Sequence, residues 1–163
     1  MSDTPTAPEE EFTDRKHLQR LRVAFKRPPI YFVTITVLDR RKALVDHGLA
    51  PVVVSALEEA SQMNGWLVGR YVIMPDHVHF FCGAGASVND LSKFVGCLKA
   101  LSTRHAWAEG WHGRLWQKEF HDHLLRSAES YEQKWHYVLE NPVRAGLCRE
   151  AEEWPYQGEM EVL

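Results

Sequence analysis

Hydrophobic residues recur along this chain with two periods, and the shorter period predicts four β-strands. Residues 30–38, IYFVTITVL, are dense in β-branched and aromatic side chains that alternate between two faces. Residues 67–74 and 77–82 form two further runs of this kind, joined by Pro75-Asp76 as in a hairpin. A shorter run over residues 120–125 is the fourth predicted strand.

The longer, helical period predicts three helices. The first covers residues 51–64, which begin with a proline and are followed by a glycine. The second runs from residue 91 to near residue 110, after Ser87 and Asp90, which resemble a capping box. The third begins at the cap Ser130 and ends near Asn141, because a proline follows.

The resulting order, β-α-β-β-α-β-α, predicts an α+β fold of the ferredoxin-like type. This fold has a four-stranded antiparallel sheet with two helices on one face, and here an additional C-terminal helix follows. The other face of the sheet is expected to be open. With 163 residues, of which 45% are hydrophobic, the chain can bury one core without disulfides or a structural metal.

Charge divides the chain into three parts. Residues 1–14 carry five acids and no lysine or arginine and are expected to be a disordered acidic tail, and residues 149–163 form an acidic C-terminal tail. Residues 15–148 form the domain, which opens with a basic segment suited to phosphate contact. A solvated amphipathic helix is the alternative reading of that segment. The basic residues are Arg15, Lys16, Arg20, Arg22, Lys26 and Arg27.

Composition also excludes several classes of protein. Three cysteines at wide, unequal spacing argue against a secreted disulfide framework and against a four-cysteine zinc site. No apolar run has the length of a membrane span, and the acidic start does not resemble a signal peptide. We therefore expect a cytoplasmic protein without a membrane partner.

Two histidines are the first candidate for chemistry. His77 and His79 are two residues apart on a predicted strand, so their side chains leave the same face about 6.6 Å apart. Val78, Phe80 and Cys82 leave the apolar face, which directs the histidines to the open side of the sheet. Such a pair can bind one ion, although hydrogen-bonded or exposed histidines are the commoner explanation.

The last predicted helix carries a second candidate. Tyr137 and Asn141 are four residues apart and therefore share one helical face. A tyrosine, with a pKa of ~10, is a nucleophile only next to a base or a cation. A half-buried helix tyrosine and a helix-terminating asparagine are the structural alternatives.

Three blocks of the sequence resemble the REP-associated tyrosine transposases, a branch of the single-tyrosine HUH transposases. The blocks are MPDHVHFF (74–81), LWQKEFHDHLLR (115–126) and YVLENPVRAGL (137–147). Weaker similarity extends over about residues 20–157, and Gln157-Gly158 stand where the family often has two serines. The resemblance implies that residues 15–148 form an HUH transposase-like domain whose additional C-terminal helix carries the nucleophile.

The resemblance also implies roles for single residues. His77, His79 and Asn141 would bind a divalent metal, Mg²⁺ or Mn²⁺, and Tyr137 would be the catalytic nucleophile. The implied activity is DNA transposition, by cleavage and rejoining of single-stranded DNA at REP-type hairpins through a 5′-phosphotyrosine. Ligand chemistry alone would rank imidazole with zinc, copper or iron.

The block around residue 122 holds a second His-x-His pattern. Asp122 would point to the face opposite His121 and His123, so support of the active site by Asp122 and His123 is favoured over a second metal site. The base for Tyr137 stays open among these three residues and Glu140. A binding role for DNA is expected of Arg144, with a structural role in a turn as the alternative, and of the aromatic rings of Phe32 and Tyr71, which can stack on bases.

Two other functions compete with the transposase interpretation. One is a noncatalytic module that binds single-stranded nucleic acid, and the other is a zinc hydrolase in which water is the nucleophile. The oligomeric state is open between monomer and homodimer, as is the use of Tyr137 within its own chain or across chains.

Overall fold

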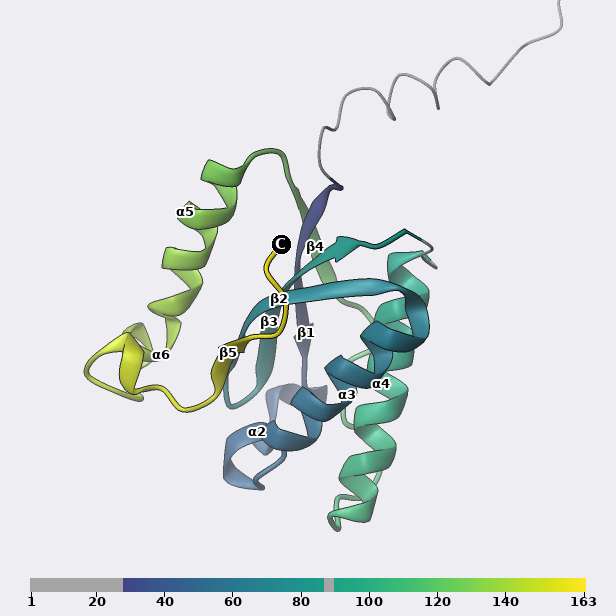
Figure 1. Ribbon diagram of the computed structural model, residues 1–163. Coiled ribbons are helices and arrows are strands. Elements are labelled where there is room, and N and C mark those ends of the chain that lie inside the picture. The colour runs from purple at the N-terminus through teal and green to yellow at the C-terminus, as the bar shows by residue number, and fades with distance from the viewer. Residues whose placement is uncertain (1–27, 87–89) are drawn as a thin grey trace, which may run out of the picture.

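The computed structural model describes residues 28–86 and 90–163, and its centre is one antiparallel sheet (Figure 1). The sheet has five strands in the order β4-β1-β3-β2-β5. The four predicted strands are all present, and a fifth is added at the edge. Their bounds are β1 (Ile30–Thr36), β2 (Trp66–Ile73), β3 (His77–Ala84), β4 (His121–Leu125) and β5 (Gln157–Glu159).

The fifth strand lies within residues 149–163, which we predicted to be a tail. β5 pairs antiparallel with β2, and Trp154 just before it is buried. The indole of Trp154 donates to the carbonyl oxygen of Ile73 at 2.9 Å. This segment is therefore part of the folded domain. The predicted acidic tail over residues 1–14 lies outside the described residues.

The two long helices, α3 (Ala50–Asn64) and α4 (Leu91–Ala108), pack on one face of the sheet, as predicted. Asp90 caps α4, since its side chain accepts from the backbone N–H of Lys93 at 2.8 Å. Ser87, the other residue of the predicted capping box, lies outside the described residues.

The predicted last helix is divided in two. It begins with α5 (Ala128–Leu139) after the cap Ser127 and continues as α6 (Asn141–Arg144), which has a proline in its first turn. Helices α2 (Ala43–Asp46), η1 (Leu38–Arg40) and η2 (Ala151–Glu153) are single turns. None of the helices in the described ranges is long and apolar enough to cross a membrane.

The larger core lies between the sheet and the helices α3 and α4. Val78, Phe80 and Cys82 of β3 point into this core together with Val33 and Ile35 of β1. Burial of one such side chain is worth about 1.5–3 kcal/mol, so the apolar face of β3 is strongly specified. The other face of β3, which carries His77 and His79, is thereby directed away from α3 and α4.

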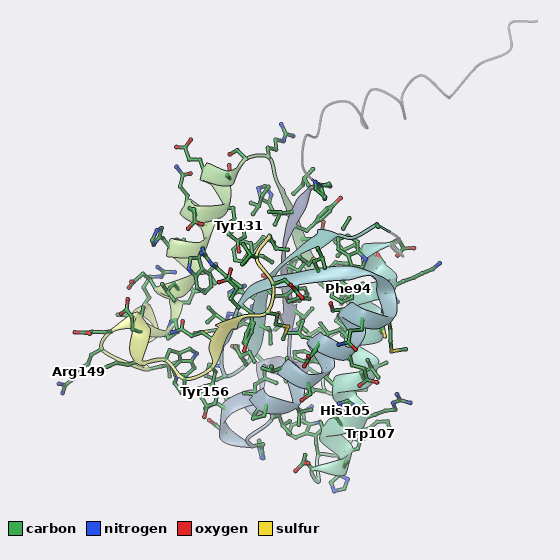
Figure 2. The ribbon with its side chains drawn as sticks, in the orientation of Figure 1. Phe94, His105, Trp107, Tyr131, Arg149 and Tyr156 are labelled. Atoms are coloured by element: carbon green, nitrogen blue, oxygen red, sulfur yellow. The ribbon has the colours of Figure 1, made fainter. Side chains whose placement is uncertain are left out.

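The opposite face of the sheet is not open, contrary to our prediction. Helix α5 crosses it, and Tyr131 and Val138 pack there against Phe32 and Phe81 in a second core. Phe94 of α4 and Tyr131 of α5 approach the sheet from its two sides (Figure 2). The predicted α+β class with an antiparallel sheet and helices is confirmed, with this face partly covered.

Arg70 of β2 attaches α5 to the sheet. Its guanidinium forms a salt bridge with Glu132 at 3.0 Å and another with Glu159 of β5 at 3.4 Å. The Cζ atom also lies 5.4 Å from the ring centres of both Tyr131 and Trp135. One cation thus joins β2, β5 and the helix that carries Tyr137.

Candidate active site

The histidine pair lies at the start of β3, and both residues have cross-strand partners on β1. His77 is paired with Thr36 and His79 with Thr34. The two Nε2 atoms are 3.1 Å apart, and the ring planes meet at 77°. The predicted convergence of the two imidazoles on one face of the strand is present.

Each imidazole is oriented through its other nitrogen. Nδ1 of His77 lies 2.6 Å from the Oδ1 atom of Asp76, and Nδ1 of His79 lies 2.8 Å from the hydroxyl of Thr34. Arg40 donates to the second oxygen of Asp76 at 3.3 Å. This arrangement leaves both Nε2 atoms directed at the same point, as in metal sites whose histidines are held by carboxylates and hydroxyls.

The surroundings of the pair lower the pKa values of both Asp76 and His79. Burial raises the pKa of the Asp76 carboxyl, but hydrogen bonding to His77 and Arg40 and their charges outweigh it, so the pKa lies below its usual value. Burial, together with electrostatic interactions with His77 and Lys134, lowers the pKa of His79 to about 3 against the opposing charge of Asp76. His79 is therefore neutral at neutral pH and has a lone pair to offer a cation.

The donor set fits a small divalent ion. Nitrogen–metal bonds of ~2.1 Å allow two nitrogens 3.1 Å apart to bind the same ion. Among the residues that the structure describes, no group of three or more histidines, cysteines and acids is close enough to hold a metal. A third protein ligand would then be of another kind, such as the amide of Asn141.

Tyr137 projects from α5 with 60% of its surface exposed. Lys134, one turn earlier, has its Nζ atom 5.6 Å from the ring centre of Tyr137 and 4.6 Å from that of Phe32. Phe32 in turn stacks on His79, with 5.2 Å between ring centres. A continuous series of contacts thus joins the phenol to the histidine pair through Lys134, a residue that our sequence analysis did not single out.

Asn141 begins α6 and contacts Arg144. The Arg144 guanidinium donates to the Asn141 Oδ1 atom and, at 2.5 Å, to the carbonyl oxygen of Tyr137. Its Cζ atom lies 4.2 Å from the centre of the Tyr137 ring. Within the described residues, no hydrogen bond or ring contact joins Tyr137 or Asn141 directly to His77 or His79.

The second His-x-His pattern has the orientation we predicted. His123 pairs with Phe32 and His121 with Thr34, so both lie on the face of the histidine pair at the sheet edge. Asp122 faces the opposite side, where burial of the Cys82 thiol and, to a smaller extent, the charge of Asp122 raise the pKa of that thiol. The side chain of Asp122 therefore points away from the face of the site that it was expected to support.

The residues expected to contact DNA differ in position. Phe32 is only 8% exposed and is covered by Lys134 and His79, and Tyr71 packs on the main core with its hydroxyl beside Gly158. Neither ring is a free stacking platform. The basic residues Arg15, Lys16, Arg20, Arg22, Lys26 and Arg27 lie outside the described residues.

A family model described as "Transposase IS200 like" matches residues 29–141, which include the histidine pair, the tyrosine and the asparagine. The chain belongs to this transposase family. The match covers more than two thirds of the chain, so the predicted enzyme class, a tyrosine transposase, is confirmed.

The relatives of this transposase agree with the resemblance found in the sequence. It is 21% identical to a REP-associated tyrosine transposase of Escherichia coli K12, over 77% of this chain and 73% of that protein. A Haemophilus influenzae protein assigned to the same group is 24% identical, over 81% and 80% of the two chains. A solved REP-associated tyrosine transposase bound to a REP hairpin has the same fold, with a TM-score of 0.69 and 21% identity over 82% of this chain and 78% of that one.

Proposed function

We propose that this transposase cleaves and rejoins single-stranded DNA at REP-type hairpins through a covalent 5′-phosphotyrosine at Tyr137. His77, His79 and Asn141 would hold a divalent metal, Mg²⁺ or Mn²⁺, beside the scissile phosphate. The series of contacts from Tyr137 through Lys134 and Phe32 to His79 carries the proposal, because it brings a phenol and a metal-type donor set to one face of the sheet.

The metal part of the proposal is supported by the orientation of the imidazoles. If the Nδ1 atom of His77 donates to Asp76, its Nε2 lone pair points at the Nε2 atom of His79, only 3.1 Å away. When the Nδ1 atom of His79 likewise donates, to Thr34, both Nε2 lone pairs are free to bind one cation. When bound, the divalent ion would supply positive charge that polarises a non-bridging oxygen of the phosphate.

The chemical step is a transesterification. The Tyr137 oxygen attacks phosphorus in line, a phosphorus–oxygen bond to tyrosine forms, and the bond to the 3′-oxygen breaks. The phenol releases one proton and the departing 3′-oxygen takes one up, so the step is neutral in protons. Attack of that 3′-hydroxyl on the phosphotyrosine reverses the step and rejoins the strand.

Lys134 contributes a positive charge at this step. Its ammonium lies between the rings of Tyr137 and Phe32, so a phosphate brought to the phenol would meet it. A fixed cation close to developing negative charge stabilises the transition state.

The hairpin is proposed as substrate because a solved relative is bound to a REP hairpin. An enzyme that acts on DNA is consistent with the cytoplasmic location expected from the sequence.

The test uses a hairpin oligonucleotide with single-stranded flanks, labelled in separate reactions at the 3′ end and the 5′ end. With Mg²⁺ or Mn²⁺, the 3′-labelled fragment should remain attached to the protein on a denaturing gel, and the 5′-labelled fragment should be released free. Tyr137→Phe should form no such band. Tyr156→Phe, which alters a half-buried tyrosine packed on Trp154, is the matched control and should retain the band.

Two outcomes would overturn the proposal in favour of its competitors. Metal-dependent nicking that persists in Tyr137→Phe without a covalent band indicates a hydrolase with water as nucleophile. Hairpin binding without cleavage by the wild-type protein, under any divalent metal, indicates a noncatalytic binding module.

A further inference from the structure

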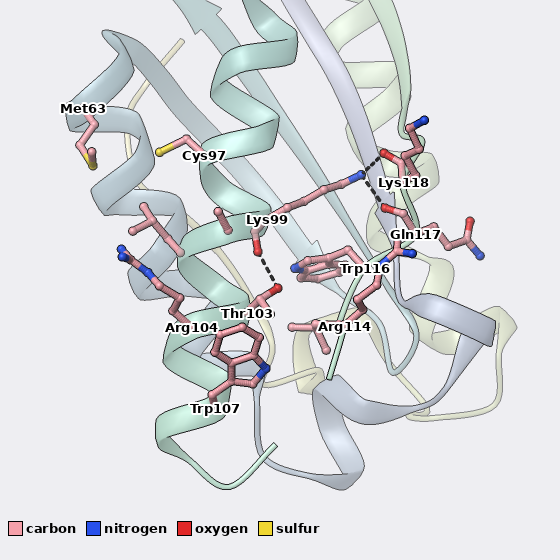
Figure 3. A pocket seen from close by; sticks show the side chains of 13 residues that line it. Met63, Cys97, Lys99, Thr103, Arg104, Trp107, Arg114, Trp116, Gln117 and Lys118 are labelled. Atoms are coloured by element: carbon pink, nitrogen blue, oxygen red, sulfur yellow. Dashed lines mark hydrogen bonds between the residues drawn. The ribbon is translucent and has the colours of Figure 1, made fainter. Parts of the chain in front are cut away.

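A groove lies on the side of the sheet away from the histidine pair, between α4 and the loop that follows it (Figure 3). Its volume is about 680 Å³, within the range of pockets that hold small ligands. Basic, aromatic and apolar side chains line it, and no acidic residue does. The basic and aromatic lining residues are Lys99, Arg104, Trp107, Arg114, Trp116 and Lys118.

Three of the four cations in the groove are available to a ligand. Lys99 is engaged, since its ammonium donates to the carbonyl oxygens of residues 117, 118 and 119 at 2.9, 3.0 and 2.8 Å. Arg104, Arg114 and Lys118 are exposed, and no carboxylate of the described residues forms a salt bridge with them. Such unpaired cations around one groove are suited to an anionic chain.

The pKa of Lys99 is affected by burial and by the charges around the groove. Burial lowers the pKa of Lys99, Glu119 opposes this, and the positive charge of Arg114 lowers it further. Because Lys99 ties the loop to α4 through three carbonyl groups, it fixes the wall of the groove.

Trp107 gives the groove an aromatic surface that is both exposed and held in position. It is 52% exposed, yet its indole N–H donates to the carbonyl oxygen of Gly113 at 2.8 Å. A large exposed ring with a fixed orientation is suited to stacking on an unpaired base, which is the usual partner of such rings in single-strand binding sites. Trp116, by contrast, is buried and donates to Ser102, so it belongs to the wall.

Although the groove lies on the opposite side of the sheet from the histidine pair, Gln117 of its lining lies beside β1, the strand that pairs with the histidines. The backbone N–H of Gln117, at the rim of the groove, donates to the carbonyl oxygen of Thr36 at 2.9 Å. Thr36 is the strand partner of His77. Two strand spacings, about 10 Å, therefore separate the backbone at this rim from the backbone at the histidine pair.

We propose that this groove binds the single-stranded DNA next to the cleavage site, with a base on Trp107 and phosphates on Arg104, Arg114 and Lys118. The inference rests on the proposed function, because it extends the path of the same DNA over the sheet edge from His77. A pocket of this size with one stacking ring suits a few unpaired nucleotides, whereas a duplex presents no exposed base face to such a ring.

The experiment measures binding in the Tyr137→Phe background, so that no chemistry is required. Two probes are compared, a hairpin with single-stranded flanks and the same hairpin without them. Trp107→Leu should weaken binding of the flanked hairpin by about fivefold to 100-fold and leave the bare hairpin unchanged. Arg104→Gln combined with Arg114→Gln should lower the slope of log K against log[salt] by roughly 1.4, about 0.7 for each lost phosphate contact.

Lys93→Gln is the matched control, since Lys93 is an exposed cation of α4 that does not line the groove. It should leave both affinities and the salt slope unchanged. Equal losses for the flanked and the bare hairpin would overturn the proposal and assign the groove to the stem, and no loss for either would remove the groove from DNA binding. If wild-type protein fails to cleave while the flank-specific losses appear, the groove assignment stands and the proposed catalytic function falls.

Discussion

The guanidinium of Arg144 lies over the ring of Tyr137, with 4.2 Å between its Cζ atom and the ring centre. The same group donates to the backbone of Tyr137 and to the side-chain oxygen of Asn141. Arg144 therefore positions the proposed nucleophile and the proposed third metal ligand together, a role beyond the DNA contact expected from the sequence.

We expect Arg144→Ala to lower the single-turnover rate of DNA cleavage by about 100-fold, because displacement of a reacting group by ~1 Å has an effect of this size. Arg144→Lys should recover only part of the rate, since an ammonium cannot make the same paired contacts. Arg149→Ala, which removes an exposed arginine nearby, serves as control. A wild-type rate in Arg144→Ala would refute the positioning role.

A second prediction concerns the metal. His77→Ala and His79→Ala should each lower the affinity for Mn²⁺ by at least about tenfold, because one of two converging Nε2 donors is lost. Titration calorimetry, or the electron paramagnetic resonance signal of free Mn²⁺, measures this affinity directly. His121→Ala, on the edge strand of the same face, should bind Mn²⁺ as the wild type does. Binding of two equivalents by the wild type would contradict a single site.

Replacement of Lys134, which lies near the rings of both Tyr137 and Phe32, should slow DNA cleavage without changing the stability of the fold. Lys134→Met keeps the length of the side chain over Phe32 but removes the charge near Tyr137, so cleavage should slow by about 100-fold with unchanged thermal stability. The positive charge of Lys134 also lowers the pKa of His79, so this pKa should rise in the variant when followed by NMR. Lys134→Arg should restore the pKa. An unchanged His79 titration in Lys134→Met would mean that the ammonium does not act on the site.

Whether the sequence could predict a feature of this site depends on how far apart along the chain the contacting residues are. Alternation along β3 was sufficient to direct Val78 and Phe80 into the core and the two histidines to the other face, because a strand has a fixed period. The spacing of Tyr137 and Asn141 likewise predicted that they lie close together in the last helical segment, although the helix is divided after Leu139, so that Tyr137 belongs to α5 and Asn141 to α6. In each case neighbours in the chain decide the outcome.

Contacts between distant segments were not predictable in this way. Lys134 lies one turn before Tyr137, but its importance depends on Phe32, about one hundred residues earlier in the chain. The covering of the second sheet face by α5 depends in the same way on Tyr131, which packs on Phe81 of β3. Strand β5, with a central glycine and no β-branched residue, forms because the edge of β2 offers it backbone partners.

The buried histidine makes the stability of the metal-free protein depend on pH. The pKa of His79 is about 3 in the folded chain and near its ordinary 6.5 when unfolded, so acid protonates the unfolded chain first. The stability that the neutral imidazole contributes is complete above pH 6.5 and is lost as the pH falls toward 3. Between pH 7 and pH 5 the loss from this group should be about 2 kcal/mol of unfolding free energy.

Urea unfolding at both pH values, with a chelator present, measures this loss. His79→Gln removes the titrating group but keeps a polar side chain beside Thr34. The decrease in unfolding free energy between pH 7 and pH 5 should therefore be about 2 kcal/mol smaller in His79→Gln than in the wild type. Equal decreases in the two proteins would mean that His79 is protonated in the folded chain at pH 5, which would also remove its lone pair as a ready ligand for a metal.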